Sequence, residues 1–258
     1  MSRMKLAALL CTAVVVTLLA SPAPVTEDTE LRDLDVTGWE CANQFEGSAQ
    51  SREARERNRM KNRWPVNLSV FTVESLDTAA FLKKVREYDS RLQSEHRSEL
   101  TAAQKDQLDS YENQIVSLTG WLVLAYPGQA ETANCGSPIF HDWHLEIFAE
   151  PSDHAPRVGD ATPIICEITP RTERRIYRDG VRIQALTGFF RLQDLSYHAT
   201  AHTAKKVCVT GYLMWDDQHN RSGHVGTTVQ YFSSDGFHHP WRSTAWEIHP
   251  VMKIDVIE

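Results

Sequence analysis

The sequence predicts a mainly β chain of the α+β class, in which N-terminal helices precede a small closed barrel of five strands. Two observations carry this prediction. Apolar residues recur with a helical period before Ser117 and alternate as in strands after it. The strands come as three, then a polar connection with room for a helix, then two more.

Residues 1–25 are predicted to be a signal peptide and not part of the fold. Two basic residues precede an apolar run from Leu6 to Ala20, and a small, turn-prone segment follows the run. The run is shorter than the roughly 20 residues that a membrane-spanning helix needs. We expect cleavage between Ala20 and Val25, no membrane span in the mature chain, and a periplasmic or extracellular location.

The polar N-terminal arm, residues 26–66, has no sustained period. Its basic stretch runs from Arg52 to Arg63 and also contains two acids, Glu53 and Glu56, which partly compensate its charge. One interpretation is a short solvated helix. The other is an arm that folds over the barrel and contributes basic side chains to a binding site there.

Residues 67–116 are predicted to be a helical segment that packs on the barrel. Apolar residues from Phe81 to Leu92 form one stripe at a period of 3.6, which predicts a helix over residues 76–92. Thr101 and Gln104 have the spacing of a capping box and indicate the start of a second helix.

Residues 117–258 are predicted to form the barrel. Strands are expected at residues 118–126, 142–148, 163–169, 207–215 and 245–257. This order is that of an oligonucleotide/oligosaccharide-binding (OB) barrel, whereas a two-sheet sandwich would need about seven strands. Gly120 and Gly211 fit strands that coil sharply around a small barrel.

Four cysteines follow the signal peptide, and an even number in an exported chain permits two disulfides in three pairings. Cys41 and Cys135 lie in polar, loop-like sequence and are the favoured bridge. Cys166 and Cys208 lie inside apolar runs, where a free cysteine packs as a small hydrophobic residue.

Acids and histidines occupy alternate positions of several predicted strands. Since side chains alternate between the two faces of a strand, His144, Glu167 and His249 are expected to meet on one surface. Histidine and carboxylate ligands of this kind suit a divalent metal such as zinc or manganese. The predicted metal ligands are Asp142, His144, Asp216, His219 and His249. The alternative is that these side chains face solvent, because a one-residue error in register would turn any of them over.

A second group of residues is predicted to bind the ligand. Guanidinium groups hold carboxylates or phosphates with paired hydrogen bonds, although surface salt bridges are the alternative role. The group consists of Lys61, Arg63, Asn134, Glu167, Arg171, Arg242 and Glu247.

The formal charge of −7 disfavours nucleic acid as the partner, because such proteins need a basic face to release counterions. The ligand is therefore expected to be a small molecule or an oligomer. The sequence lacks the G-x-S-x-G motif, the phosphate loop and the dinucleotide fingerprint.

Several blocks of the chain resemble a family of exported bacterial proteins. The most specific is Trp246-Glu-Ile-His-Pro-Val251, and Asp142-x-His144 and Glu167-Ile-Thr-Pro-Arg171 belong to the same pattern. The resemblance covers about residues 55–258. It implies a bacterial source and points to the polar residues of these blocks as a site, without implying an activity.

Two hypotheses for the function follow. The first is an exported OB-like module that binds a ligand and has no catalytic role. The alternative is a metal-dependent hydrolase of the phosphodiesterase or nuclease type, with the histidine and acid cluster as its centre. The residues leave open whether the protein is an enzyme.

Overall fold

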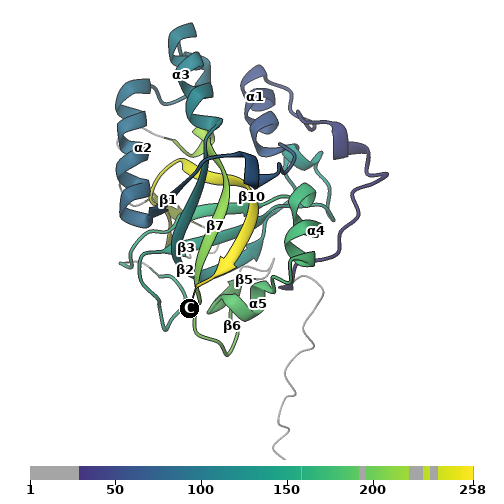
Figure 1. Ribbon diagram of the computed structural model, residues 1–258, viewed down its shortest axis with the longest axis vertical. Helices are drawn as coiled ribbons and strands as arrows, with labels where there is room; N and C mark the ends of the chain where they lie inside the picture. The colour runs from purple at the N-terminus through teal and green to yellow at the C-terminus, as the bar shows by residue number, and fades with distance from the viewer. Residues whose placement is uncertain (1–28, 158, 192–195, 221–228, 233–237, 258) are drawn as a thin grey trace, which may run out of the picture.

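The computed structural model describes residues 29–157, 159–191, 196–220, 229–232 and 238–257. A central barrel is flanked by α2 and α3 on one side and by α1 and α4 on the other (Figure 1). The predicted signal peptide lies outside the described residues. No helix among the described residues is long and apolar enough to cross a membrane.

Five strands close the barrel, which confirms the predicted OB-like architecture. The strands pair in the order β2, β3, β4, β10, β7 and back to β2; only the β4–β10 pair is parallel. They are β2 (Ile115–Pro127), β3 (Trp143–Phe148), β4 (Ile164–Ile168), β7 (Lys206–Trp215) and β10 (Trp246–Val256).

The inner face of the barrel is apolar. In β3, Trp143, Leu145 and Ile147 belong to the main core, and the residues between them point to the outer face. The glycines mark close approaches between strands. A Cβ added to Gly120 would lie 2.5 Å from Ile147 Cγ2, and one added to Gly211 would lie 2.4 Å from the Pro250 carbonyl oxygen. Side chains at both positions would therefore crowd the neighbouring strand.

The segment before the barrel contains a strand that the sequence did not predict. β1 (Val73–Asp77) pairs in parallel with β2, and α2 (Thr78–Leu92) begins only after it, with the Asp77 side chain accepting a hydrogen bond from the Ala80 N–H. The helix predicted over 76–92 therefore starts at Thr78. The polar residues of β1 show no alternation, so pairing with β2 decides its conformation.

The other predicted helix is confirmed. α3 (Ala102–Glu112) begins with a capping box between Thr101 and Gln104. Tyr88 of α2 and Tyr111 of α3 stack on each other and meet Trp246 edge-on, which attaches the helix pair to the barrel core.

The N-terminal arm lies against the outer face of the barrel. It carries η2 (Glu40–Asn43), α1 (Arg52–Lys61) and η3 (Leu68–Val70). The predicted disulfide between Cys41 and Cys135 is confirmed, and it ties the arm to the loop that follows β2. Cys166 and Cys208 are free thiols.

The polar connection between β4 and β7 is more ordered than its sequence indicates. It contains α4 (Pro170–Arg178), α5 (Ile183–Leu186), β5 (Phe189–Arg191) and β6 (Tyr197–Ala199). β5 extends the sheet by pairing with β2. Further along the chain, β8 (Val229–Phe232) and β9 (His238–Arg242) form a separate two-stranded sheet. These strands are too short for their periodicity to be recognised.

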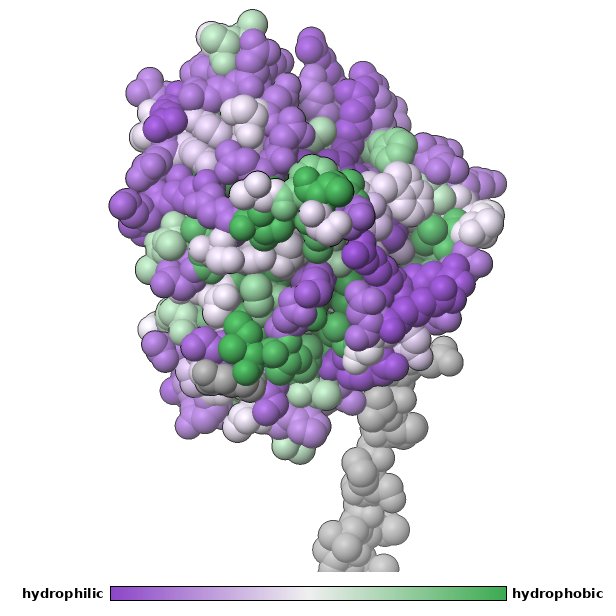
Figure 2. Space-filling view, in the orientation of Figure 1, coloured by the Kyte–Doolittle hydropathy of each residue, from purple (hydrophilic) through white to green (hydrophobic). Residues whose placement is uncertain are grey.

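The remaining short helices are η4 (Arg97–Glu99), η5 (Thr132–Asn134) and η6 (Asp217–His219). The surface of the face seen in Figure 2 is mostly hydrophilic over the upper helices, with hydrophobic groups gathered lower down.

Candidate functional site

A buried polar cluster covers the outer face of the barrel. His144, Glu167, Glu247 and His249 lie on three adjacent strands, β3, β4 and β10, and alternate there with core residues. All are at most 9 % exposed. The register of β10 with β7 shifts between Ile248 and Val251, which places His249 at an irregular point of the strand.

The centre of this cluster is a group of three residues, Asp142, Glu167 and His249. Each offers an atom that lies within 4.8 Å of the other two. His249 Nε2 is 3.5 Å from Asp142 Oδ2, and His249 Nδ1 is 3.2 Å from Glu167 Oε2. The imidazole ring therefore lies between the two carboxylates.

Each of these three side chains is held by a partner through its other polar atom. Asn134 Nδ2 donates to Asp142 Oδ1 at 3.0 Å. His144 Nε2 lies 3.1 Å from Glu167 Oε1. His249 Nδ1 lies 2.9 Å from Glu247 Oε1, and Arg242 in turn donates to the second oxygen of Glu247. Outer partners of this kind fix the orientation of metal ligands.

Three buried atoms at the centre have no hydrogen-bond partner within the part of the chain that the structure describes. They are Asp142 Oδ2, Glu167 Oε2 and His249 Nε2. A buried polar atom without a partner costs free energy, on the order of 1–3 kcal/mol. These three atoms lie around the ring of His249, with Asp142 Oδ2 beside Nε2 and Glu167 Oε2 beside Nδ1.

The cluster contains more acid than base. Five carboxylates, those of Asp142, Glu167, Asp216, Glu247 and Glu131, face two cations, Lys61 and Arg242, which gives a formal charge of −3 while the histidines are neutral. Arg57 links the cluster to a neighbouring network of ion pairs. That network adds two arginines and two acids, so the sum is unchanged; they are Arg57, Arg97, Asp217 and Glu112.

The pKa values reflect this charge. Burial raises the pKa of Asp142 to about 6, although His249 beside it acts in the opposite direction. Burial would also raise the pKa of Glu167, but His144, Lys61 and His249 hold it well below its usual range. The pKa of each histidine is raised, because the neighbouring carboxylates outweigh the effect of burial. Without a metal ion, protons on the histidines would compensate the acids.

A cavity of about 430 Å³ opens beside the cluster. Its wall combines basic, acidic and aromatic side chains; those used below are Arg57, Lys61, Glu131, His144, Arg191 and Trp241. Lys61 Nζ lies 3.0 Å from Asp216 Oδ2 and 3.4 Å from Glu131 Oε2. Glu131, His144 and Glu167 form a further group whose atoms lie within 4.8 Å of one another.

The structure brings most of the predicted site residues together. His144, Glu167 and His249 meet as expected, and Asn134, Asp142, Arg242 and Glu247 surround them. Two predicted metal ligands have a different position. Asp216 forms an ion pair with Lys61, and His219 lines the cavity edge-on to Trp241. Neither belongs to a metal-capable group among the described residues.

Arg63 and Arg171 are corrections to the predicted ligand-binding group. Arg63 donates to the carbonyl oxygens of Glu112 and His249 and stacks on Tyr212. Arg171 donates to the carbonyl oxygens of Cys41 and Ala42 and to the Asn62 side chain. Arg171 is buried, Arg63 is half-buried, and neither lines the cavity. Their donors are taken up by carbonyls, so they fasten the arm and are not free for an anion.

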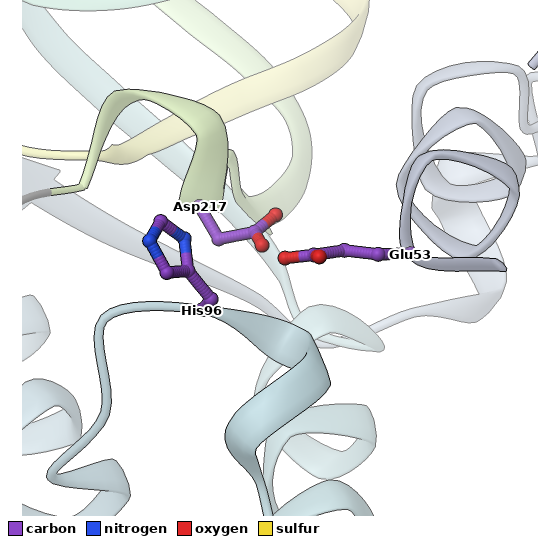
Figure 3. A group of neighbouring side chains, drawn as sticks. All are labelled: Glu53, His96 and Asp217. Atoms are coloured by element: carbon purple, nitrogen blue, oxygen red, sulfur yellow. The ribbon is translucent and has the colours of Figure 1, made fainter. Parts of the chain in front are cut away.

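Sequence reasoning missed Glu131 as a metal-capable residue. It lies in the loop after β2, where strand alternation gives no information. It also missed a separate group at the junction of the arm and the helices, formed by Glu53, His96 and Asp217. Figure 3 shows Asp217 extended toward Glu53, which comes from α1, with the His96 ring beside it.

No family model matches this chain, and no curated protein matches it either. The site has therefore to be interpreted from its geometry.

Proposed function

We propose that this protein is an exported barrel module that binds one or more divalent ions, zinc or manganese, on its outer face and a small anionic ligand in the adjacent cavity. The observation that carries the proposal is the set of three unpartnered, buried atoms on Asp142, Glu167 and His249. Acid and histidine side chains that lie within reach of one another, each held by an outer partner, are what a metal site requires.

The donor set also fits. Two carboxylates and one imidazole are ligands for zinc and manganese. With metal–ligand distances of about 2.0–2.2 Å, neighbouring ligand atoms of a tetrahedral site lie roughly 3.3–3.6 Å apart. The His249 Nε2 to Asp142 Oδ2 distance of 3.5 Å is of this size.

The cavity wall favours an anionic ligand. Arg57, Lys61 and Arg191 carry their positive charge to it, and Trp241 and the Tyr126–Arg191 stack supply flat surfaces. A metal ion would add to the positive potential at the base of the cavity. Charge of one sign within a cleft raises the local concentration of ligands of the opposite sign.

Export is supported by the predicted signal peptide and by the disulfide between Cys41 and Cys135. Disulfides form and persist in oxidising compartments such as the periplasm. The resemblance to exported bacterial proteins agrees with this location.

Metal-dependent hydrolysis of a phosphodiester is the second candidate. It is favoured by the position of Lys61 and Arg57 on the wall next to the carboxylate and histidine groups. A bound divalent ion can lower the pKa of a water molecule, and the basic side chains would hold the anion in place.

The test is metal analysis of the purified mature protein. We expect at least one zinc or manganese ion per chain in the wild type and a loss of metal in His249→Ala and Asp142→Asn. The matched control is His202→Ala, which removes an exposed histidine and should keep the metal. Circular dichroism would verify that the variants are folded.

A folded wild-type protein that binds neither metal after incubation with it would overturn the proposal, as would equal metal contents in His249→Ala and His202→Ala. The hydrolase is tested with bis(p-nitrophenyl) phosphate. Turnover that is lost in His249→Ala and kept in His202→Ala would favour the enzyme over the binding module.

A further inference from the structure

Glu167 presents its two oxygens to two different histidines. Oε1 lies 3.1 Å from His144 Nε2, and Oε2 lies 3.2 Å from His249 Nδ1. The arrangement follows from the sheet, because β4 lies between β3, which carries His144, and β10, which carries His249. A carboxylate placed in this way can bind one ion through each oxygen.

Each histidine has a second carboxylate of its own. His249 has Asp142 on the inner side, and His144 has Glu131 on the side of the cavity. The result is two groups of one histidine and two acids, with Glu167 shared between them. Glu167 is only 1 % exposed, and its Oε2 has no hydrogen-bond partner among the described residues.

Lys61 would keep an acidic partner if Glu131 turned toward a metal ion. Lys61 Nζ is 3.0 Å from Asp216 Oδ2, which is its nearer partner, and 3.4 Å from Glu131 Oε2. The Glu131 side chain is 29 % exposed, so it can turn toward an ion without disturbing the core.

The excess of acid in the cluster is large enough to accept a second divalent ion. The formal charge is −3 with neutral histidines. One divalent ion changes this sum to −1 and two change it to +1, before Arg57 and Arg191 at the cavity wall are counted. Pairs of metal ions about 3.5–4 Å apart are known to hold the oxygens of phosphoryl groups between them.

We infer that the site is dinuclear. Glu167 bridges an inner ion, bound by Asp142 and His249, and an outer ion, bound by Glu131 and His144 at the floor of the cavity. The outer ion contacts the ligand, whose class is a phosphate or phosphate ester. This inference rests on the proposed function, since it adds a second ion to the one proposed there.

The experiment uses the mature protein, stripped with a chelator and then reloaded with manganese. The measurements are the number of ions per chain after gel filtration and the electron paramagnetic resonance spectrum. We expect two ions with the spectrum of a spin-coupled pair. Glu131→Gln should retain one ion with the spectrum of isolated manganese. Glu150→Gln, which alters an exposed glutamate at the end of β3, should behave as the wild type.

Phosphate binding provides a second measurement. We expect calorimetry with inorganic phosphate to show binding to the two-ion form and at least tenfold weaker binding to Glu131→Gln, while Glu150→Gln is unchanged. One ion per chain in the wild type, unaffected by Glu131→Gln, would overturn the dinuclear site and leave the proposed function intact. Two ions that both persist in Glu131→Gln would also overturn it. No bound ion at all would overturn the proposed function itself.

Discussion

Two groups in this protein have the same ingredients and opposite surroundings. The barrel-face group (Asp142, Glu167, His249) and the junction group (Glu53, His96, Asp217; Figure 3) each combine one histidine and two acids within 4.8 Å. The barrel-face group has a polar atom without a hydrogen-bond partner on each of its members, within the described residues.

In the junction group, arginines already satisfy the buried acid. Asp217 Oδ1 accepts from Arg57 at 3.0 Å and from Arg97 at 3.2 Å, and Oδ2 accepts from the Arg97 backbone N–H. Its pKa is lowered, since the bond with Glu53 and the two arginines outweigh burial. The pKa of Glu53 is raised, first by its hydrogen bond with Asp217.

The difference teaches that residue types within reach of one another do not make a metal site. What matters is whether donors from the protein already occupy the acceptor atoms. At the junction, two arginines balance Asp217 and Glu112, so the group fastens α1 to the helices and the end of β7. On the barrel face the acids are in excess, and a cation from outside is needed.

The largest effect is expected from Arg97→Ala. Arg97 bonds both Glu112 and Asp217 and donates to the Trp215 carbonyl oxygen, and its removal leaves two buried acids without their main partner. We expect a loss of about 3–5 kcal/mol in the free energy of unfolding, measured by urea denaturation. Arg91→Ala, on the exposed side of α2, is the control. Equal free energies of unfolding for the two variants would contradict a stabilising role of the junction group.

Metal binding separates the two groups directly. Zinc or manganese at 100 times its dissociation constant should stabilise the wild type by about 2.7 kcal/mol, seen as a rise in the melting temperature. The rise should disappear in Asp142→Asn and persist in His96→Ala. The opposite pattern would reverse the comparison and place the ion at the junction.

The two barrel glycines differ in their distance from the barrel-face group, so substitutions there separate an effect on stability from an effect on metal binding. Valine at Gly120 or Gly211 should cost on the order of 1–3 kcal/mol through overpacking, because either Cβ would meet a neighbouring strand. Gly211 faces Pro250, the residue after His249, so Gly211→Val should also weaken metal binding, whereas Gly120→Val should not. Unchanged melting temperatures in both variants would count against the close approach of the strands.

The smallest effect concerns Asp89, a half-buried acid that accepts a hydrogen bond from an uncharged donor. Trp246 Nε1 donates to it at 2.9 Å, and burial raises its pKa from 3.8 to about 6. The folded state therefore binds the proton more tightly than the unfolded state does. The stability is fully present below about pH 4 and is lost as the pH rises through about 6.

The expected contribution of Asp89 to this loss is on the order of 1–2 kcal/mol. Asp89→Asn should remove that part of the pH dependence in denaturation measured between pH 4 and 8. A profile identical to that of the wild type would mean that Asp89 titrates normally, as a solvated acid would.

The features that the sequence determined by itself are those with a local signal. Strand alternation placed His144, Glu167 and His249 on one face, and the spacing of strands gave the barrel order. The capping box fixed the start of α3, and the polar surroundings of Cys41 and Cys135 indicated the bridge. Each signal depends on neighbouring residues and on the two-residue or 3.6-residue repeat of the backbone.

The tertiary structure alone decided which donors meet which acceptors. Lys61 and Glu131 are 70 positions apart, and Arg97 and Asp217 are 120 apart, so no local pattern relates them. For the same reason the sequence could not distinguish Arg63 and Arg171, whose donors are taken up by carbonyls, from Lys61 at the cavity. A buried acid either forms a structural ion pair or remains able to bind a metal ion, depending on which side chains surround it. Those neighbours come together only when the chain has folded.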